Sequence, residues 1–143
     1  MKVELSDNEA TRRARAALNL PDTVPAHAWH VRRLDREGDA YYLVVFGELN
    51  AAIAVVAVGA ERGEVRTSAR LPGRLPHLTI DAAQARARTN MGSDAQAELV
   101  WMPSRASRSP LYPLWEIQSG GRVVYVDHQG VTWVDLREVG QGG

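Results

Sequence analysis

Two stretches of this 143-residue chain share nearly the same pattern, and this repetition constrains the fold more than any other feature. The first is IAVVAVGAERGEVRTSARL, residues 53–71, and the second is RVVYVDHQGVTWVDL, residues 122–136. Each contains two runs rich in β-branched residues, joined by a turn with a glycine, Gly63 or Gly130. A bulged hairpin turn needs a positive φ, which glycine adopts without steric cost. Each stretch is therefore predicted to be a β-hairpin.

Each half of the chain also begins with the pattern of an amphipathic helix. Ser6 with Glu9 three residues later is typical of a capping box, and Pro21 is expected to stop the first helix. For the second helix we expect Thr79 as the N-cap and Gly92 as the left-handed stop. The residues expected to face a sheet are mostly alanines, namely Ala10, Ala14, Ala17 and Leu18 in the first helix and Ile80, Ala83, Ala87 and Met91 in the second.

Extended segments follow each helix, rich in Val, Ile, Tyr and Trp and bounded by Gly, Asp and Pro. They are residues 26–34, 40–49, 52–58 and 63–71 in the first half, and 97–103, 111–118, 123–128 and 131–136 in the second. Pro113 has no N–H to donate, so its strand is expected to begin there or to lie at a sheet edge.

Matching features of the two halves stand about 70 residues apart, which is the spacing that a tandem repeat would leave. The matched pairs are Ser6 and Thr79, Trp29 and Trp101, and Gly63 and Gly130. We therefore predict an α+β fold class with two tandem repeats of one helix packed on a small antiparallel sheet, and we expect the two repeats to superpose. The units would be residues 1–71 and 72–143, with a linker at about 70–78 and a flexible tail at 138–143. The alternative is the loose self-similarity that any α+β protein offers.

The last hairpin, YVDHQGVTWVDL, resembles the end of a unit of the PepSY-like family, whose units close with a similar Val-Asp-turn-Gly hairpin. The match is carried by Tyr125, Val126, Asp127 and Gly130. The first copy keeps Gly63 and Val65 but has Gly59 near the position of the aspartate. This resemblance implies a cystatin-like sheet curved around a helix. It also implies a mostly extracytoplasmic family whose members occur beside peptidases or act as binding, inhibitory or chaperone-like modules.

The charge and composition of the chain exclude several classes of protein. The 17 basic and 17 acidic side chains cancel, whereas a general nucleic-acid or anionic-membrane binder would show a basic excess. The absence of cysteine excludes disulfides, thiolate metal sites and thiol catalysis. No segment approaches the ~20 apolar residues of a membrane span, and the N-terminus has no signal-peptide pattern. We therefore expect a soluble cytoplasmic protein, or an extracytoplasmic one if a signal peptide has been removed.

Sequence motifs for catalysis or metal binding are absent: there is no nucleophile elbow, no HExxH and no P-loop. His27 and His30 would share a metal on a helix, but they point to opposite faces on a strand, which their context favours. Asp127 and His128 are expected to be neighbours in a turn, where an aspartate ordinarily accepts a backbone N–H. Glu98 and Glu116 are either a carboxylate pair on adjacent strands or solvated strand positions. The sequence predicts no metal, no cofactor and no enzymatic activity.

The segment VWMPSRASRSPLYPLWEI, residues 100–117, is where we expect a partner to bind. Aromatic residues and arginines are enriched at interfaces, since both supply large contact areas with directional donors. The candidate partner-binding residues are Trp101, Arg105, Arg108, Tyr112 and Trp115. The alternative is that the tryptophans fill the second core while the arginines are solvated on a long hairpin.

These observations predict a non-catalytic peptide- or protein-binding module, with neither nucleic acid nor membrane as partner. An open antiparallel edge is expected to accept an extended chain by strand addition, and a homodimer is compatible with this interpretation. The alternative is a small-molecule-binding protein or small enzyme with a pocket between sheet and helix, which a cleft with converging His27, His30 or Glu116 would favour. A third interpretation is a structural module in a larger assembly.

Overall fold

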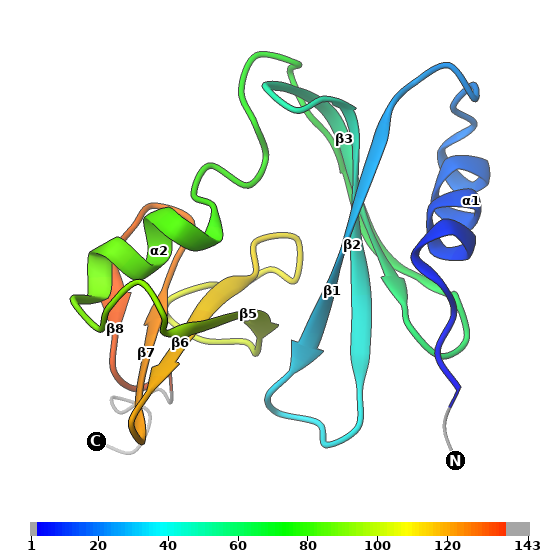
Figure 1. Ribbon diagram of the computed structural model, residues 1–143. Coiled ribbons are helices and arrows are strands. Elements are labelled where there is room, and N and C mark those ends of the chain that lie inside the picture. Colours follow the sequence, from blue (N-terminus) through cyan, green and yellow to red (C-terminus); the bar gives the residue numbers. More distant parts are fainter. Residues whose placement is uncertain (1–2, 137–143) are drawn as a thin grey trace. The chain divides into compact units, whose positions relative to one another are not determined.

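The computed structural model describes residues 3–136, and the chain divides into two compact units, Met1–His77 and Leu78–Gly143 (Figure 1). The first unit contains α1 (Asp7–Leu18), β1 (Ala26–Arg33), β2 (Ala40–Glu48), β3 (Ala51–Gly59) and β4 (Val65–Arg70). The second contains α2 (Ala82–Thr89), β5 (Gln96–Trp101), β6 (Leu114–Ser119), β7 (Arg122–Val126) and β8 (Thr132–Trp133).

The large share of sheet contradicts the predicted fold class. Over residues 3–136 the chain has eight strands and only two helices, of 12 and 8 residues, and it is not two tandem repeats of one helix on a small sheet. The last strands also differ, since β4 has six residues and β8 has two. Hairpins with a turn glycine recur in any sheet-rich chain, so the repeated pattern reports local turn chemistry and not a duplicated fold.

The sheet of the first unit has the strand order β4-β3-β2-β1, and every neighbouring pair is antiparallel. Its strand β2 is buried without interruption from Ala40 to Gly47. A strand with one wet face alternates apolar and polar residues, whereas the run AYYLVVFG is typical of a strand shielded on both faces. One helix covers only one face of a sheet, so this two-sided burial does not fit a simple helix-on-sheet repeat.

Helix α1 begins and ends with polar caps. The N–H of Glu9 donates to Oγ of Ser6 over 3.1 Å, which confirms Ser6 as the N-cap. The carboxylate of Glu9 accepts hydrogen bonds from Arg12 and Arg13, which lower the pKa of Glu9 to about 2. The helix ends at Leu18, and the next residue adopts the left-handed C-cap conformation before the proline that was expected to stop the helix.

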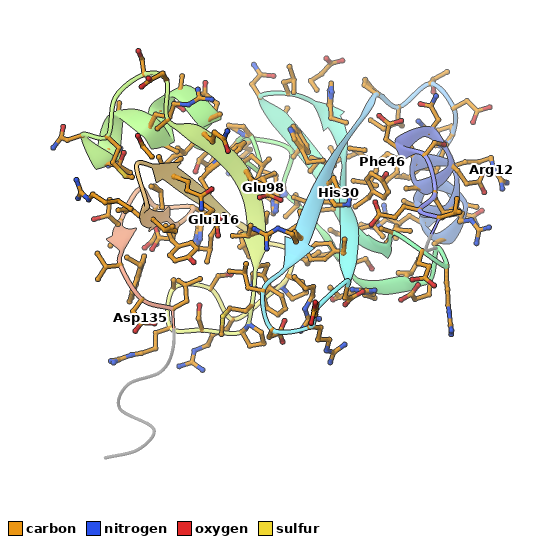
Figure 2. The ribbon with its side chains drawn as sticks, turned by 60° about the horizontal axis from the view of Figure 1, so that its bottom comes forward. Arg12, His30, Phe46, Glu98, Glu116 and Asp135 are labelled. Atoms are coloured by element: carbon orange, nitrogen blue, oxygen red, sulfur yellow. The ribbon has the colours of Figure 1, made fainter. Side chains whose placement is uncertain are left out.

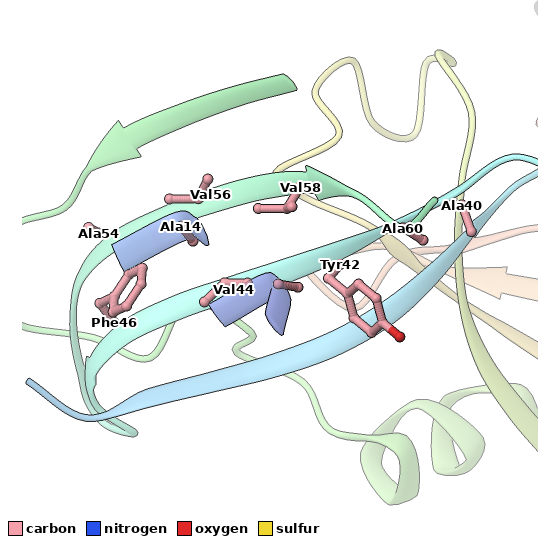
Figure 3. Packing of buried hydrophobic residues seen from close by; sticks show 10 residues of the cluster. Ala14, Ala40, Tyr42, Val44, Phe46, Ala54, Val56, Val58 and Ala60 are labelled. Carbon is pink, nitrogen blue, oxygen red and sulfur yellow. The ribbon is translucent and has the colours of Figure 1, made fainter. Parts of the chain in front are cut away.

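Small side chains let α1 lie close to the sheet. Ala10 and Ala14 are fully buried against an apolar cluster on β2 and β3 (Figure 3). The largest members of the cluster are Tyr42, Val44, Phe46, Val56 and Val58. Ala17 was predicted to share this face but is exposed, while Leu18 packs against the cluster from the last turn.

The sheet of the second unit has the strand order β5-β6-β7-β8, again with antiparallel neighbours. Strand β6 begins directly after Pro113, as the missing N–H predicted. It lies between β5 and β7, so the strand that follows the proline is not an edge strand.

Helix α2 begins two residues later than the sequence predicted. Its N-cap is Asp81, whose carboxylate accepts from the N–H of Gln84 over 2.8 Å, while the Gln84 side chain accepts from the N–H of Asp81 over 2.9 Å. This reciprocal pair is a capping box, which holds the helix start more firmly than a single threonine hydroxyl. Thr79, the predicted N-cap, instead donates its hydroxyl to the carbonyl of His128 over 2.6 Å.

The predicted apolar face of α2 is wrong in part. Ile80 and Ala85 are buried and Met91 packs against them, but Ala83 and Ala87 are exposed. The helix presents Ala85, and not Ala83 or Ala87, to the core of the second unit. The helix is also stopped earlier, by a left-handed Asn90 and not by the glycine two residues on.

The segment predicted to link the two halves is bound to β3. The N–H of Leu71 donates to the carbonyl of Ile53 over 2.8 Å, and the N–H of Gly73 donates to the carbonyl of Ala52 over 3.0 Å. This part of the chain therefore extends the first unit. The predicted flexible tail, 138–143, lies outside the described residues.

The turn glycines behave as predicted, with φ of 76° at Gly63 and 85° at Gly130. Replacing Gly130 with valine should lower the free energy of unfolding by about 1–3 kcal/mol, because a β-branched residue is strongly disfavoured at positive φ. A Cβ there would also lie 2.6 Å from Nη1 of Arg88. Urea denaturation measures the loss. Gly130→Asn should lower the free energy of unfolding by less, since asparagine tolerates a positive φ. Equal decreases for both variants would contradict the assignment of Gly130 as the positive-φ residue of the turn.

The alanine contact of α1 can be tested within one helix. Ala14→Leu should lower the free energy of unfolding by about 1–3 kcal/mol, because the larger side chain cannot fit between helix and sheet. Ala17→Leu makes the same change at an exposed position of the same helix and should stay within about 0.5 kcal/mol of the wild type. Thermal and urea denaturation measure the stability of both variants. An equal decrease in the free energy of unfolding for Ala17→Leu and Ala14→Leu would mean that the buried face of the helix is misassigned.

Candidate functional site

A hollow of about 430 Å³ opens in the second unit between the β5–β6 loop and the β7–β8 turn. Residues from both segments line it, including Arg105, Arg108, Tyr112, Asp127, His128 and Trp133. Three of the five residues predicted to bind a partner are among them. We call this site the loop–turn hollow.

Buried serines hold the β5–β6 loop. Nε1 of Trp101 donates to Oγ of Ser107 over 3.2 Å, and this hydroxyl donates to the carbonyl of Tyr112 over 2.6 Å. The N–H of Ser107 donates to Oγ of Ser104 over 3.3 Å. These bonds cross the loop from within, so its long connection has a defined conformation. Neither serine was predicted to have this role, although two serines three residues apart are typical of local side chain–backbone bonding.

The β7–β8 turn is built around the carboxylate of Asp127, which is 5% exposed. Its Oδ1 accepts from the N–H groups of Gln129 and Val131, each over 2.9 Å, and its Oδ2 accepts from Nε1 of Trp133 over 2.9 Å. The turn role predicted for Asp127 is confirmed, and the bond to the tryptophan ring adds to it. Both oxygens are thus occupied by donors of the protein itself.

The two predicted tryptophans lie away from the lining of the loop–turn hollow. Trp101 is 4% exposed and is bonded to the loop serine. Trp115 packs against the core of the second unit and donates Nε1 to the carbonyl of Ile80 over 2.8 Å. Their positions agree with the alternative given above for the tryptophans, in which they fill the second core.

His128 combines three features at the wall of the hollow. Its ring lies against Tyr112, with centroids 4.8 Å apart and planes tilted by 39°. Its carbonyl accepts the Thr79 hydroxyl. Its Nδ1 atom is buried and has no hydrogen-bond partner among the described residues. Buried polar atoms are nearly always bonded, so this nitrogen needs a physical explanation.

Exposed cationic and apolar side chains surround the hollow. Arg105 and Arg108 are both exposed on the loop. On the turn side, Val131 of the lining is 49% exposed to solvent, and Val134, three residues further along the chain, is 81% exposed. The combination of arginines, a tyrosine and exposed valines differs from the charged and polar surface that a solvated loop would present.

The other candidate residues occupy the strand positions that the sequence predicted. His27 lies beside Trp29, with ring centroids 6.2 Å apart, whereas His30 lies against Tyr42 at 5.4 Å. The strand therefore turns the two histidines to opposite faces. Nε2 of His30 is 3.0 Å from Oε1 of Glu4.

Glu98 and Glu116 are directly opposite each other on β5 and β6 (Figure 2). Glu116 is buried and Glu98 is exposed. The two carboxylates are thus paired across adjacent strands, which is one of the two alternatives given above, while their environments differ.

A second hollow, of about 600 Å³, lies in the first unit beside His30. Its aspartates are bound by arginines: Asp35 accepts from Arg33 over 2.6 Å, and Asp39 accepts from Arg66 over 2.8 Å. These hydrogen bonds lower the pKa of both carboxyl groups, so neither can serve as a general acid near neutral pH. Across residues 3–136 no three histidine, aspartate or glutamate side chains are grouped so as to hold a metal ion.

No family model, curated protein or solved structure matches the chain. The resemblance to the PepSY-like family therefore rests on the hairpin motif of Tyr125, Val126, Asp127 and Gly130 alone. Among the helices that the structure describes, none is long and apolar enough to cross a membrane.

Because the carboxylate of Asp127 accepts three hydrogen bonds, a small change in this side chain should clearly lower the stability of the unit. Asp127→Asn keeps the shape but replaces an acceptor oxygen with an NH₂ group, which leaves a donor of the turn or of Trp133 without an acceptor. The free energy of unfolding should fall by about 1–3 kcal/mol. Asp94→Asn makes the same substitution at an exposed position of this unit and should change little. Urea denaturation compares the two, and an equal effect would contradict a structural role for Asp127.

Proposed function

We propose that the chain is a non-catalytic peptide- or protein-binding module and that its partner binds in the loop–turn hollow. The observation that carries this proposal is the placement of Arg105, Arg108 and Tyr112 together around one hollow whose lining also includes the exposed Val131. Arginine and tyrosine are the side chains that most often contribute binding energy at interfaces. The hairpin motif shared with the PepSY-like family also favours a binding role.

The hydrogen bonds within the β5–β6 loop favour a binding surface over a loop that is merely exposed to solvent. A loop that must become ordered on binding loses conformational entropy, which lowers affinity. Ser104, Ser107 and Trp101 already bond this loop to itself before any partner arrives. Asp127 does the same for the opposite turn. Both walls of the hollow are therefore preorganised, and only exposed side chains must change rotamer.

The exposed valines supply the apolar part of the surface. Val134 is the most exposed of the large apolar side chains over residues 3–136, and Val131 lines the hollow itself. Covering them on binding would remove apolar area from water, at roughly 25 cal/mol per Å². An extended peptide presents side chains and backbone groups together, so it suits a hollow that offers apolar and charged groups side by side.

A small-molecule site or small enzyme in the first unit is the second candidate function. The pairing of His30 with Glu4 at the edge of the larger hollow favours it, because a histidine held by a carboxylate is a frequent acid–base group. The arginine-bound aspartates of that hollow argue against it, since they are already occupied.

A random-peptide library displayed on phage and selected on the full chain tests the proposal. Selected peptides should shift the amide NMR signals of the loop–turn hollow. Arg105→Ala with Arg108→Ala should weaken binding by about 1–3 kcal/mol while the melting temperature stays nearly unchanged. The matched control is Arg74→Ala with Arg122→Ala, which removes the same charge from exposed positions outside the hollow.

Three results would contradict the proposal: no enrichment, shifts confined to other surfaces, or equal affinity of both double variants. Shifts around His30 would instead favour the second candidate.

A further inference from the structure

We propose that the loop–turn hollow recognises an acidic residue of the partner, followed or preceded by an apolar one. The carboxylate would accept hydrogen bonds from Arg105 and from Nδ1–H of His128, and the apolar neighbour would cover Val131 and Val134. This inference rests on the proposed peptide-binding function and adds the chemistry of the ligand.

The charges around the hollow favour an anionic ligand. Among the charged residues that line it, Arg105 and Arg108 are cationic and Asp127 is anionic. The aspartate is buried and both its oxygens accept bonds from within the turn, so it presents no free oxygen to a ligand. The accessible charge is therefore positive, and a guanidinium binds a carboxylate through paired N–H donors.

The buried nitrogen of His128 supplies a second donor. Its ring is fixed by the contact with Tyr112 and by the bond between its carbonyl and Thr79, so Nδ1 keeps its place in the wall. This atom has no partner among the described residues, and leaving it unbonded is unfavourable for folding. It is screened from water, where a charge-assisted hydrogen bond is stronger than at an exposed site. Because the atom is buried in the free chain, side chains at the wall of the hollow must move for a ligand to reach it.

The exposed valines favour a peptide over a free small carboxylate as the ligand. A small anion such as acetate would use the donors but leave Val131 and Val134 exposed. A peptide that carries the acidic residue can also cover Val131, which lines the same hollow. The hollow therefore fits a segment of another protein better than a free metabolite.

The first experiment compares matched peptides. The tightest octapeptide from the library selection, acetylated and amidated at its ends, is titrated by calorimetry beside the same peptide with Glu replaced by Gln. The acidic form should bind about 10-fold more tightly, and the advantage should shrink as salt rises. Arg105→Gln should remove most of this advantage. Arg122→Gln, the exposed control, should leave it unchanged.

The second experiment separates a ligand contact from a structural role of His128. His128→Phe keeps a ring against Tyr112 but removes the unpaired nitrogen. The melting temperature should be unchanged or higher, while the preference for the acidic peptide falls about 5-fold or more. A lower melting temperature with unchanged preference would mean that His128 is purely structural and would overturn its part in the proposal.

The outcomes distinguish this inference from the proposed function. Peptides that bind in the hollow with no acidic residue, or with equal affinity for the Glu and Gln forms, would overturn the inference and leave the binding function intact. Acetate that binds as tightly as the peptide would overturn the choice of a peptide ligand. A selection that yields no peptide for the hollow would overturn both.

Discussion

Eight consecutive residues of β2, from Ala40 to Gly47, are shielded from water, and the sheet of the first unit depends on this burial. A strand enclosed on both sides must satisfy every N–H and carbonyl through its neighbours, which the antiparallel pairs with β1 and β3 provide. On one face the strand packs against the alanines of α1, whose small side chains permit the close contact. The repeat of one helix on one sheet failed as a prediction because it assigned β2 only this one face.

The loop–turn hollow is organised by a different force. Its two walls are connecting segments held by hydrogen bonds to buried side chains, and the β5–β6 loop also buries Ala106 and Leu111. Ser107 bonds the β5–β6 loop to Trp101, and Asp127 bonds the β7–β8 turn to Trp133. In both walls an indole N–H ties the connection to a neighbouring strand. The tryptophans thus position the surface, and the loop arginines are the side chains that it presents.

Local features of the fold were predictable from the sequence, whereas features that depend on distant residues were not. The strands, the Ser6 cap and the positive φ at Gly130 follow from short-range chemistry, and the structure agrees with them. The start of α2 was misplaced because Asp81 with Gln84 competes with Thr79, whose hydroxyl bonds instead to a turn 49 residues away. In the same way, aromatic composition drew attention to a segment that lines the hollow, but it could not separate the buried tryptophans from the tyrosine at the hollow.

The polar groups of the hollow differ in what they contribute to the fold. The hydroxyl of Ser107 and the carboxylate of Asp127 are buried and bonded, so they stabilise the loop and the turn directly. Nδ1 of His128 is buried without such a bond, although an apolar ring would fill the same place beside Tyr112. The nitrogen therefore adds nothing to the stability of the unit that a carbon atom would not add. In the proposed binding function, this nitrogen is one of the groups that would donate a hydrogen bond to a carboxylate of the partner.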